Sequence, residues 1–237
     1  MAKLQGSLIL LPSPISDNGL ESIPPEVVRA IHSLDHFIVE RARTARRFIS
    51  STKTPKSIDS LSIEEMPEGQ FDEKEIEHSL LPIFDGHDIG IMSEAGLPAI
   101  ADPGQWYVRV AQKLGIRVIP LAGPSSLMMA LMASGLEGQR FAFHGYLSAK
   151  KDELRGQLKE LEKKADRDDA TQIWIETPYR NHQIIEGAEK YLDQNRSFCI
   201  AAGIGEENAL IMTKKISEWK KKGWPEIHKV PAVFLLR

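Results

Sequence analysis

The sequence is poor in the features that mark secreted and membrane-spanning chains. Among its 237 residues only Cys199 is a cysteine, so no internal disulfide framework can form, which suits a reducing cytoplasm. No run approaches the roughly 20 apolar residues of a membrane span, and Pro12 interrupts the N-terminal apolar stretch too early for a secretory signal. The sequence therefore predicts a soluble, cytoplasmic protein without a membrane segment.

Nucleotide-binding motifs, metal-ligand patterns and a surplus of positive charge are also missing. Neither GxGxxG nor GxxxxGK[ST] occurs, which argues against a dinucleotide fingerprint and a P-loop. The seven histidines show no ligand spacing, so no metal site is expected. A net charge of −3 provides no whole-surface field for nucleic acid, but basic patches remain open at Arg41–Arg47, Lys150–Lys151 and Lys214–Lys222, the last with Trp219.

Short apolar runs alternate with amphipathic stretches along the chain. This alternation predicts an α/β protein with βαβ units and a largely parallel sheet. Strands are expected at Ser7–Leu11, Phe37–Glu40, Asp88–Met92, Ile116–Leu121, Phe141–Tyr146, Gln172–Glu176, Phe198–Ala202, Ala209–Thr213 and Ala232–Leu236. Helices are expected at Pro25–Leu34, Ala42–Ser50, Phe71–Phe84, Gln105–Leu114, Ser125–Ser134, Lys151–Lys164, Arg180–Leu192 and Ile216–Lys222.

A change of pattern indicates two domains. The segment PLAGP at 120–124 interrupts regular structure, and the later strands lie closer together. The last strands before the C-terminus include two separated only by GIGEEN, a hairpin-like connection. We therefore predict a parallel-sheet N-terminal domain over 1–120 and a mixed-sheet C-terminal domain over 121–237.

The segment SEAGLPAIADPG at 93–104 is the most informative loop. It follows an expected buried strand, and open α/β sheets bind ligands at the carboxyl ends of their strands. Its small residues would let a ligand approach the main chain closely. Asp102 alone fits an ordinary helix cap ahead of Pro103, but the whole loop is too long for a minimal connection. A ligand site is therefore expected here.

These residues resemble a known family. SEAGLPAIADPG is similar to the S-D-A-G-x-P-x-I-S-D-P-G loop of the S-adenosylmethionine (SAM)-dependent methyltransferases with the tetrapyrrole methylase fold. Within that superfamily the chain resembles the branch that methylates the ribose 2′-oxygen of a cytidine in small-subunit (16S) ribosomal RNA. The segments GSLILLPSPISDN, RVIPLAGPSS, FHGYLSAKK and IETPYR follow that branch in the same order.

The resemblance implies a two-domain fold with SAM in a cleft between the domains, often within a homodimer, and rRNA or the small ribosomal subunit as partner. Carried over by position, the cofactor-binding residues would be Ser93, Glu94, Ala95, Gly96, Ser125, Ser126, Thr177, Pro178, Ala202, Gly203, Pro231 and Ala232. A ribose hydroxyl is a poor nucleophile, so a proton-accepting group is expected. The candidate catalytic residues are Glu40, Glu176 and Arg43, with Arg43 or Arg180 orienting a phosphate or carboxylate.

The chain departs from this branch where the methyl acceptor is expected to bind. Ser13–Asp17 replaces T-P-I-G-N, ERAR at 40–43 replaces E-D-T-R, and GIGEEN at 203–208 stands where R-E-L-T-K is usual. Two alternatives therefore stay open: a methyltransferase for a tetrapyrrole precursor or other small molecule, and a SAM-binding module without turnover. One substitution, Gly96→Val, is expected to abolish SAM binding while leaving thermal stability nearly intact.

Overall fold

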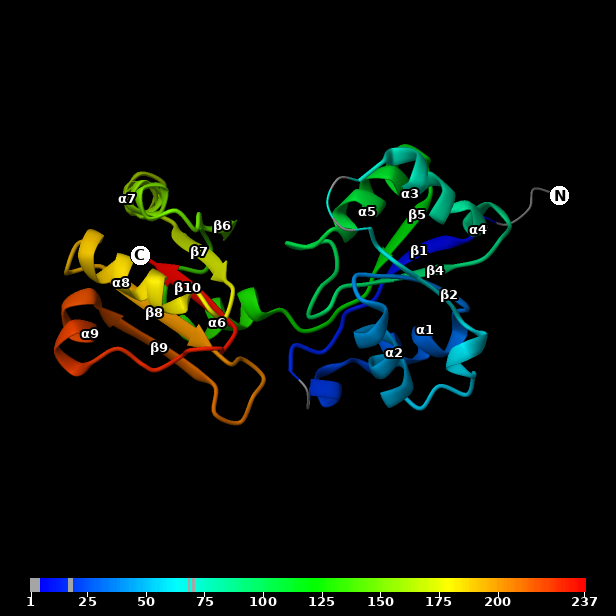
Figure 1. Cartoon of the computed structure of the whole chain (residues 1–237), viewed down its shortest axis with the longest axis horizontal. Helices are drawn as coiled ribbons and strands as arrows, with labels where there is room; N and C mark the ends of the chain where they lie inside the picture. Colours follow the sequence, from blue (N-terminus) through cyan, green and yellow to red (C-terminus); the bar gives the residue numbers. More distant parts are fainter. Residues whose placement is uncertain (1–4, 17–18, 68, 70) are drawn as a thin grey trace. The chain divides into compact units, whose positions relative to one another are not determined.

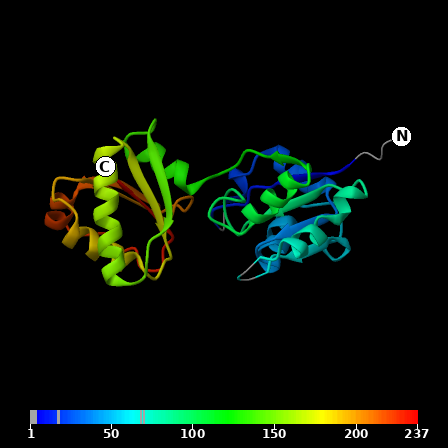
Figure 2. The same ribbon diagram turned by 90° about the horizontal axis from the view of Figure 1, so that it is seen from above.

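The computed structural model describes residues 5–16, 19–67, 69 and 71–237. The chain forms two compact units, Met1–Ser125 and Ser126–Arg237, each with its own five-stranded sheet (Figures 1 and 2). This division falls between residues 125 and 126, a little after the boundary predicted from the PLAGP segment. Asp17, part of the altered SPISD segment, lies outside the described residues.

The sheet of the first unit is parallel throughout, as predicted. Its strands are β1 (Ser7–Leu10), β2 (His36–Val39), β3 (Ser62–Glu65), β4 (Ile89–Met92) and β5 (Arg117–Pro120), in the order β3-β2-β4-β1-β5. The central strands read as continuous apolar runs because helices cover both faces of the sheet. The carboxyl ends of β1, β2 and β4 therefore lie next to one another at one edge.

Two layers of helices enclose this sheet (Figure 1). The helical segments are η1 (Gly19–Ser22), α1 (Pro25–Ser33), α2 (Ala42–Ser51), η2 (Ile58–Ser60), α3 (Glu73–Ser79), α4 (Leu81–Phe84) and α5 (Gly104–Lys113). Ile31 and Phe48 of α1 and α2 pack with Ile9 on one face. On the other face, Ile76 and Tyr107 pack with Leu8. Ile9 and Leu8 are neighbours in β1 and point to opposite faces, as the strand period requires.

Two local predictions for this unit were wrong. Strand β3 was not expected, because its sequence SIEE is polar. A polar strand is accommodated there because β3 lies at the edge of the sheet and pairs on one side only. The single helix expected over Phe71–Phe84 is two helices that meet at Leu80. Pro82 has no N–H to donate to the preceding turn, so one continuous helix cannot form there.

The second unit has the mixed sheet that was predicted. Its strands are β6 (Phe141–Tyr146), β7 (Thr171–Glu176), β8 (Ser197–Ala202), β9 (Leu210–Lys215) and β10 (Ala232–Leu236), in the order β6-β7-β10-β8-β9. Only β6 and β7 run parallel, and β8 and β9 form the antiparallel hairpin around GIGEEN. Strand β10 lies between β7 and β8, so residues of all three strands align at its start.

The core of this unit lies beneath α7 (Lys151–Arg167), α8 (Asn181–Tyr191) and α9 (Ile216–Lys222), where Trp174, Phe198 and Phe234 pack together. Helix α6 (Ser126–Ser134) packs against β8, β9 and β10. Trp219 is buried and donates its indole N–H to the carbonyl of Phe198, so the aromatic residue of the C-terminal basic cluster belongs to the core. Cys199 is buried, and burial raises the pKa of its thiol.

Candidate functional site

The loop at 93–96 is tied to the segment that follows β1. Ser13 and Gly96 exchange two backbone hydrogen bonds, with N···O distances of 2.8 and 3.0 Å, and the Ser13 hydroxyl donates to the carbonyl of Ser93 at 2.9 Å. Ser13 and Ser93 are both buried. The N–H and the carbonyl of Gly96 are thus already hydrogen-bonded within the protein. A ligand at this loop would contact its surface and side chains more than the main chain of Gly96.

Gly96 is needed for its conformation. Its φ of +75° lies in the left-handed region, where a side chain on Cβ causes strain. A Cβ atom there would meet only ordinary contacts, at 3.5 Å from Ile15 and 3.6 Å from the carbonyl oxygen of Pro124. The expectation that Gly96→Val leaves stability nearly intact is therefore wrong, because valine would strain the backbone whatever the ligand does.

Glu40 follows β2 directly and is half-buried. Its Oε2 accepts the backbone N–H of Glu94 at 2.8 Å, which brings two of the predicted site residues together. Burial raises the pKa of Glu40, and the nearby carboxylates of Asp102 and Glu94 act in the same direction. The Glu94 side chain is exposed and accepts a hydrogen bond from Thr44 of α2 at 3.2 Å. Three carboxylates therefore gather at this edge.

Asp102 shapes the rest of the loop. Its Oδ1 accepts the backbone N–H of Gly104 at 2.7 Å and its Oδ2 accepts that of Ile100 at 3.2 Å. Asp102 thus satisfies the first N–H of α5, but Pro103 is the N-cap and the helix begins at Gly104, one residue later than the expected cap at Asp102 implies. Ala99 and Ala101 have φ values of +67° and +60°, a strained pair that these hydrogen bonds hold in place. Burial raises the pKa of Asp102.

Arg43 is not part of the carboxylate cluster of Glu40, Glu94 and Asp102. It lies exposed on α2, while the preceding Arg41 pairs with Glu65 at 3.3 Å. The other oxygen of Glu65 accepts the N–H of Ala42 at 2.7 Å, and this bond, with Arg41, lowers the pKa of Glu65.

The corresponding edge of the second unit collects the remaining predicted residues. Ala232 pairs with Glu176 on one side and with Ala202 on the other. Gly203, with φ of +64°, donates its N–H to the carbonyl of Pro231 at 3.0 Å. The predicted positions at the ends of β7, β8 and β10 are therefore neighbours, and their role in binding a cofactor stays a prediction. Ser125 ends the first unit and Ser126 opens α6.

Glu176 is buried and engaged on both oxygens. Its Oε1 accepts from the N–H of Thr177 at 2.7 Å and from the Thr177 hydroxyl at 3.2 Å. Its Oε2 lies 3.0 Å from Nη2 of Arg180, in an ion pair whose angles are not those of a hydrogen bond. The same Nη2 donates to the carbonyl of Leu147 at 3.0 Å. Arg180 therefore holds the turn after β7, and its role in orienting a phosphate or carboxylate stays a prediction.

Two features of this edge were not identified as site features from the sequence. Tyr179, within the ETPYR segment, has 69% of its surface exposed and its ring contacts that of His228 edge-on. Asn181 donates to the carbonyls of Ile227 and Val230 at 2.8 and 2.7 Å, which fixes the segment before β10. His144 has a structural role, because its Nε2 lies 2.7 Å from Gln172 Oε1.

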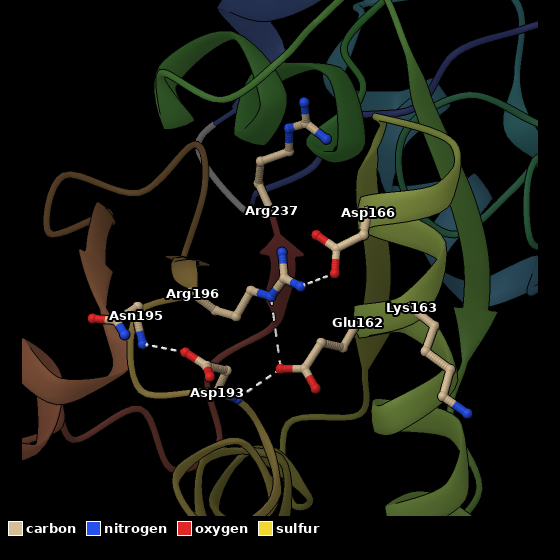
Figure 3. A pocket seen from close by; sticks show the side chains of 7 residues that line it. All are labelled: Glu162, Lys163, Asp166, Asp193, Asn195, Arg196 and Arg237. Carbon is tan, nitrogen blue, oxygen red and sulfur yellow. Dashed lines mark hydrogen bonds and ion pairs between the residues drawn. The ribbon is translucent and has the colours of Figure 1, made fainter.

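A charged pocket of about 340 Å³ lies at the other end of the second unit (Figure 3). It is lined by Glu162, Lys163, Asp166, Asp193, Asn195, Arg196 and Arg237. Arg196 is paired with Asp166 and lies 3.7 Å from Glu162, which also accepts the N–H of Asp193. These charges largely satisfy one another, so the pocket is a salt-bridge network.

Within the described part of the chain, no helix is both long and apolar enough to span a membrane. The same residues contain no group of three or more His, Cys, Asp or Glu side chains that could hold a metal ion.

Comparison with solved structures defines the class of fold. The chain is similar to the methyltransferase CobJ, with a TM-score of 0.65, 17% identity and coverage of 98% of this chain and 93% of the other. It is similarly related to CbiF, a cobalt precorrin-4 methyltransferase, with a TM-score of 0.63, 10% identity and coverage of 97% and 94%. The two-domain α/β fold that was predicted is confirmed.

The sequence comparisons identify the family. The profile of the tetrapyrrole (corrin/porphyrin) methylases matches residues 17–219, so the chain belongs to this family. Similar proteins named ribosomal RNA small subunit methyltransferase I occur in Escherichia coli O157:H7 (28% identity; 98% of this chain, 71% of the relative) and Bacillus subtilis (28%; 98% and 74%). A third, from Pseudomonas aeruginosa, is 32% identical over 74% of this chain and 58% of its own length.

The predicted class of enzyme, a SAM-dependent methyltransferase, is thereby confirmed, and SAM is the methyl donor. The first unit fits this cofactor chemically. SAM carries a sulfonium and an ammonium group, and a cation would stabilise the charge of Glu40, which burial and the nearby carboxylates of Asp102 and Glu94 disfavour.

Proposed function

We propose that this protein transfers the methyl group of SAM to the ribose 2′-hydroxyl of a cytidine in small-subunit ribosomal RNA. The observation that carries the proposal is the extent of the similarity to rRNA methyltransferases, which for the Escherichia coli and Bacillus subtilis relatives runs over 98% of this chain. CobJ and the cobalt precorrin-4 methyltransferase CbiF are similar to this chain at only 17% and 10% identity, which supports the fold and gives no support to a tetrapyrrole substrate.

Two groups of residues would bind the cofactor. In the first unit, Ser93–Gly96 forms a tight loop held by Ser13, and the exposed Glu94 carboxylate suits a cationic group. In the second unit, the prediction for Thr177–Pro178, Ala202–Gly203 and Pro231–Ala232 is supported by their position at one sheet edge. Ser125 precedes α6 and Ser126 is its first residue, and the N–H groups of this first turn suit the carboxylate of SAM.

Glu40 is our candidate for the proton acceptor. When bound, SAM supplies an electrophilic methyl group on a positively charged sulfur. The acceptor hydroxyl must lose a proton during transfer, and a carboxylate with a raised pKa takes that proton more readily than an ordinary one. Oε2 of Glu40 is held by the Glu94 N–H, while Oε1 accepts no hydrogen bond from the described residues. Glu176 is less suited, because a guanidinium and two donors already stabilise its charge.

We further propose that the protein is a cytoplasmic homodimer. Its substrate would place it with assembling ribosomes, and the second unit exposes apolar side chains suited to a protein contact. Met132 has 83% of its surface exposed, Tyr146 55% and Phe141 42%. Sedimentation should give a dimer mass for the wild type, and a monomer mass would exclude this arrangement.

The experiment that tests the function uses small ribosomal subunits that lack their usual ribose methyl groups. The protein, SAM and these subunits are incubated together, and the RNA is digested to nucleosides for mass spectrometry. We expect one 2′-O-methylcytidine per subunit. Methyl transfer to base nitrogen or carbon, or only to an added uroporphyrinogen, would contradict the proposal.

A further inference from the structure

The exposed face of α2 carries a pair of arginines that the fold does not use. Ala45, Phe48 and Ile49 are buried against the sheet. Arg43 and Arg47 are exposed, and their positions on the helical repeat place them opposite this buried stripe, one turn apart. No carboxylate among the described residues pairs with either of them.

The flanks of the same helix are occupied. On one side Thr44 donates to Glu94 of the candidate cofactor loop. On the other, Arg46 lies 3.9 Å from Asp59. Arg43 and Arg47 therefore lie between two flanks of α2. One flank contacts Glu94 of the candidate site, and the other lies near Asp59. Anything bound to the two arginines would lie beside the carboxylate cluster.

The charges of α2 also oppose the stability of the helix. Its first turn contains no acidic residue, as in α5, α6 and α8, and the Glu65 carboxylate already accepts the N–H of Ala42 there. Arg43 and Arg47 are like charges at i and i+4, which is unfavourable in a helix. A negatively charged partner would relieve this repulsion.

We propose that the Arg43–Arg47 face of α2 binds phosphates of the RNA substrate and places the target ribose at the Glu40 edge. The inference rests on the proposed function, since it names where that substrate docks. Guanidinium groups bind phosphate oxygens through paired N–H donors, and such contacts position a nucleic acid without reading its sequence. The face therefore contributes to RNA affinity and not to the choice of base.

The test measures binding of a labelled, mixed-sequence single-stranded RNA by fluorescence anisotropy, over a series of salt concentrations. The variant is Arg43→Gln/Arg47→Gln in the full chain. The control, Arg29→Gln/Arg117→Gln, removes the same charge from positions on α1 and β5. Because the variant no longer neutralises two phosphates, we expect about tenfold weaker RNA binding. The salt slope should be smaller by about 1.4, since each phosphate neutralised on a single strand contributes roughly 0.7.

The control should bind RNA like the wild type, and both variants should bind SAM like the wild type in calorimetry. Arg43→Lys/Arg47→Lys should keep the salt slope of the wild type, because the charges remain, and should lose part of the affinity, because lysine cannot form the paired N–H contacts. Equal losses in both Gln variants, or no loss in the first, would overturn the inference. If the wild type methylates ribosomal subunits while the α2 variant binds RNA normally, the inference alone fails. If the wild type neither binds RNA nor methylates subunits, the proposed function fails as well.

Discussion

Each of the two sheets presents a glutamate at the edge where the candidate site residues gather, and the two glutamates have opposite surroundings. Glu40 is half-buried, accepts one backbone N–H and lies near two other carboxylates. Glu176 is buried against Arg180 and also accepts two bonds from Thr177. Both have the same sequence context, a glutamate at the end of a strand.

These different surroundings indicate that Glu40 and Glu176 have different roles. Repulsion and burial make the charge of Glu40 costly, so this group gains from a proton or a bound cation. The charge of Glu176 is already stabilised, so its removal would leave Arg180 without its partner in a poorly solvated position. We therefore assign chemistry to the edge of the first unit and structural support to Glu176.

The largest effect should come from Glu40→Gln. The amide oxygen can still accept the Glu94 N–H, but it cannot take a proton. We expect methyl transfer to slow by about 100-fold or more, as for loss of a general base, with SAM affinity changed only a few-fold. Single-turnover transfer and calorimetry measure the two quantities. Transfer at the wild-type rate would remove Glu40 from the chemistry.

Glu176→Ala should act on stability instead. Loss of one partner of a buried ion pair costs about 3 kcal/mol, which corresponds to a fall in Tm of roughly 10 °C for a unit of this size. Scanning calorimetry of the variant beside Glu207→Ala, an exposed glutamate of the GIGEEN hairpin, checks this. An unchanged Tm in Glu176→Ala would show that the pair has no supporting role.

A smaller effect separates conformation from ligand binding at Gly96. Gly96→Ala and Gly115→Ala both place a side chain at a left-handed position, with φ of +75° and +69°, so each should cost about 1–2 kcal/mol. Gly115 precedes β5 and its Cβ would meet open space. Only Gly96→Ala should also weaken SAM binding in calorimetry. Equal SAM affinities would show that the 93–96 loop is merely a connection.

The smallest effect is a dependence of stability on pH. Since the pKa of Glu40 is raised in the folded protein, its contribution to stability is fully present below the pKa of an unfolded glutamate and is lost as pH rises through the raised value. Compared with Glu40→Gln, the wild type should therefore be relatively more stable near pH 4 than near pH 7. Denaturant titrations at both pH values test the sign, and a reversed or absent difference would contradict it.

Much of the fold could be predicted from the sequence, because the spacing of apolar residues reflects which side chains are buried. The strands at Phe141–Tyr146 and Ala232–Leu236 have the predicted bounds, and the parallel and mixed sheets are as expected. The failures lie where burial is weak or a single residue decides. Strand β3 is a polar edge strand, and Pro82 divides a helix whose apolar pattern continues across it.

The site was less predictable because side-chain partners are not encoded by local pattern. The sequence placed Glu40 and Glu176 in the same class, and nothing nearby in the chain indicated that Glu40 binds the N–H of a residue 54 positions away. Trp219 was grouped with a basic patch open to RNA, yet tertiary contacts bury it, and the ion pair between Arg180 and Glu176 could not be read from the sequence. The resemblance to the methylases supplied the cofactor, which periodicity alone could not.

The contrast between Glu40 and Glu176 is tested most directly by the single-turnover rate of methyl transfer to undermethylated small ribosomal subunits as a function of pH, at saturating SAM. We predict that the wild-type rate rises through an apparent pKa above that of an ordinary glutamate, and that Glu40→Gln removes this rise while Glu176→Gln keeps it. An unchanged pH profile in Glu40→Gln, or its loss in Glu176→Gln, would contradict the assignment of chemistry to the first unit.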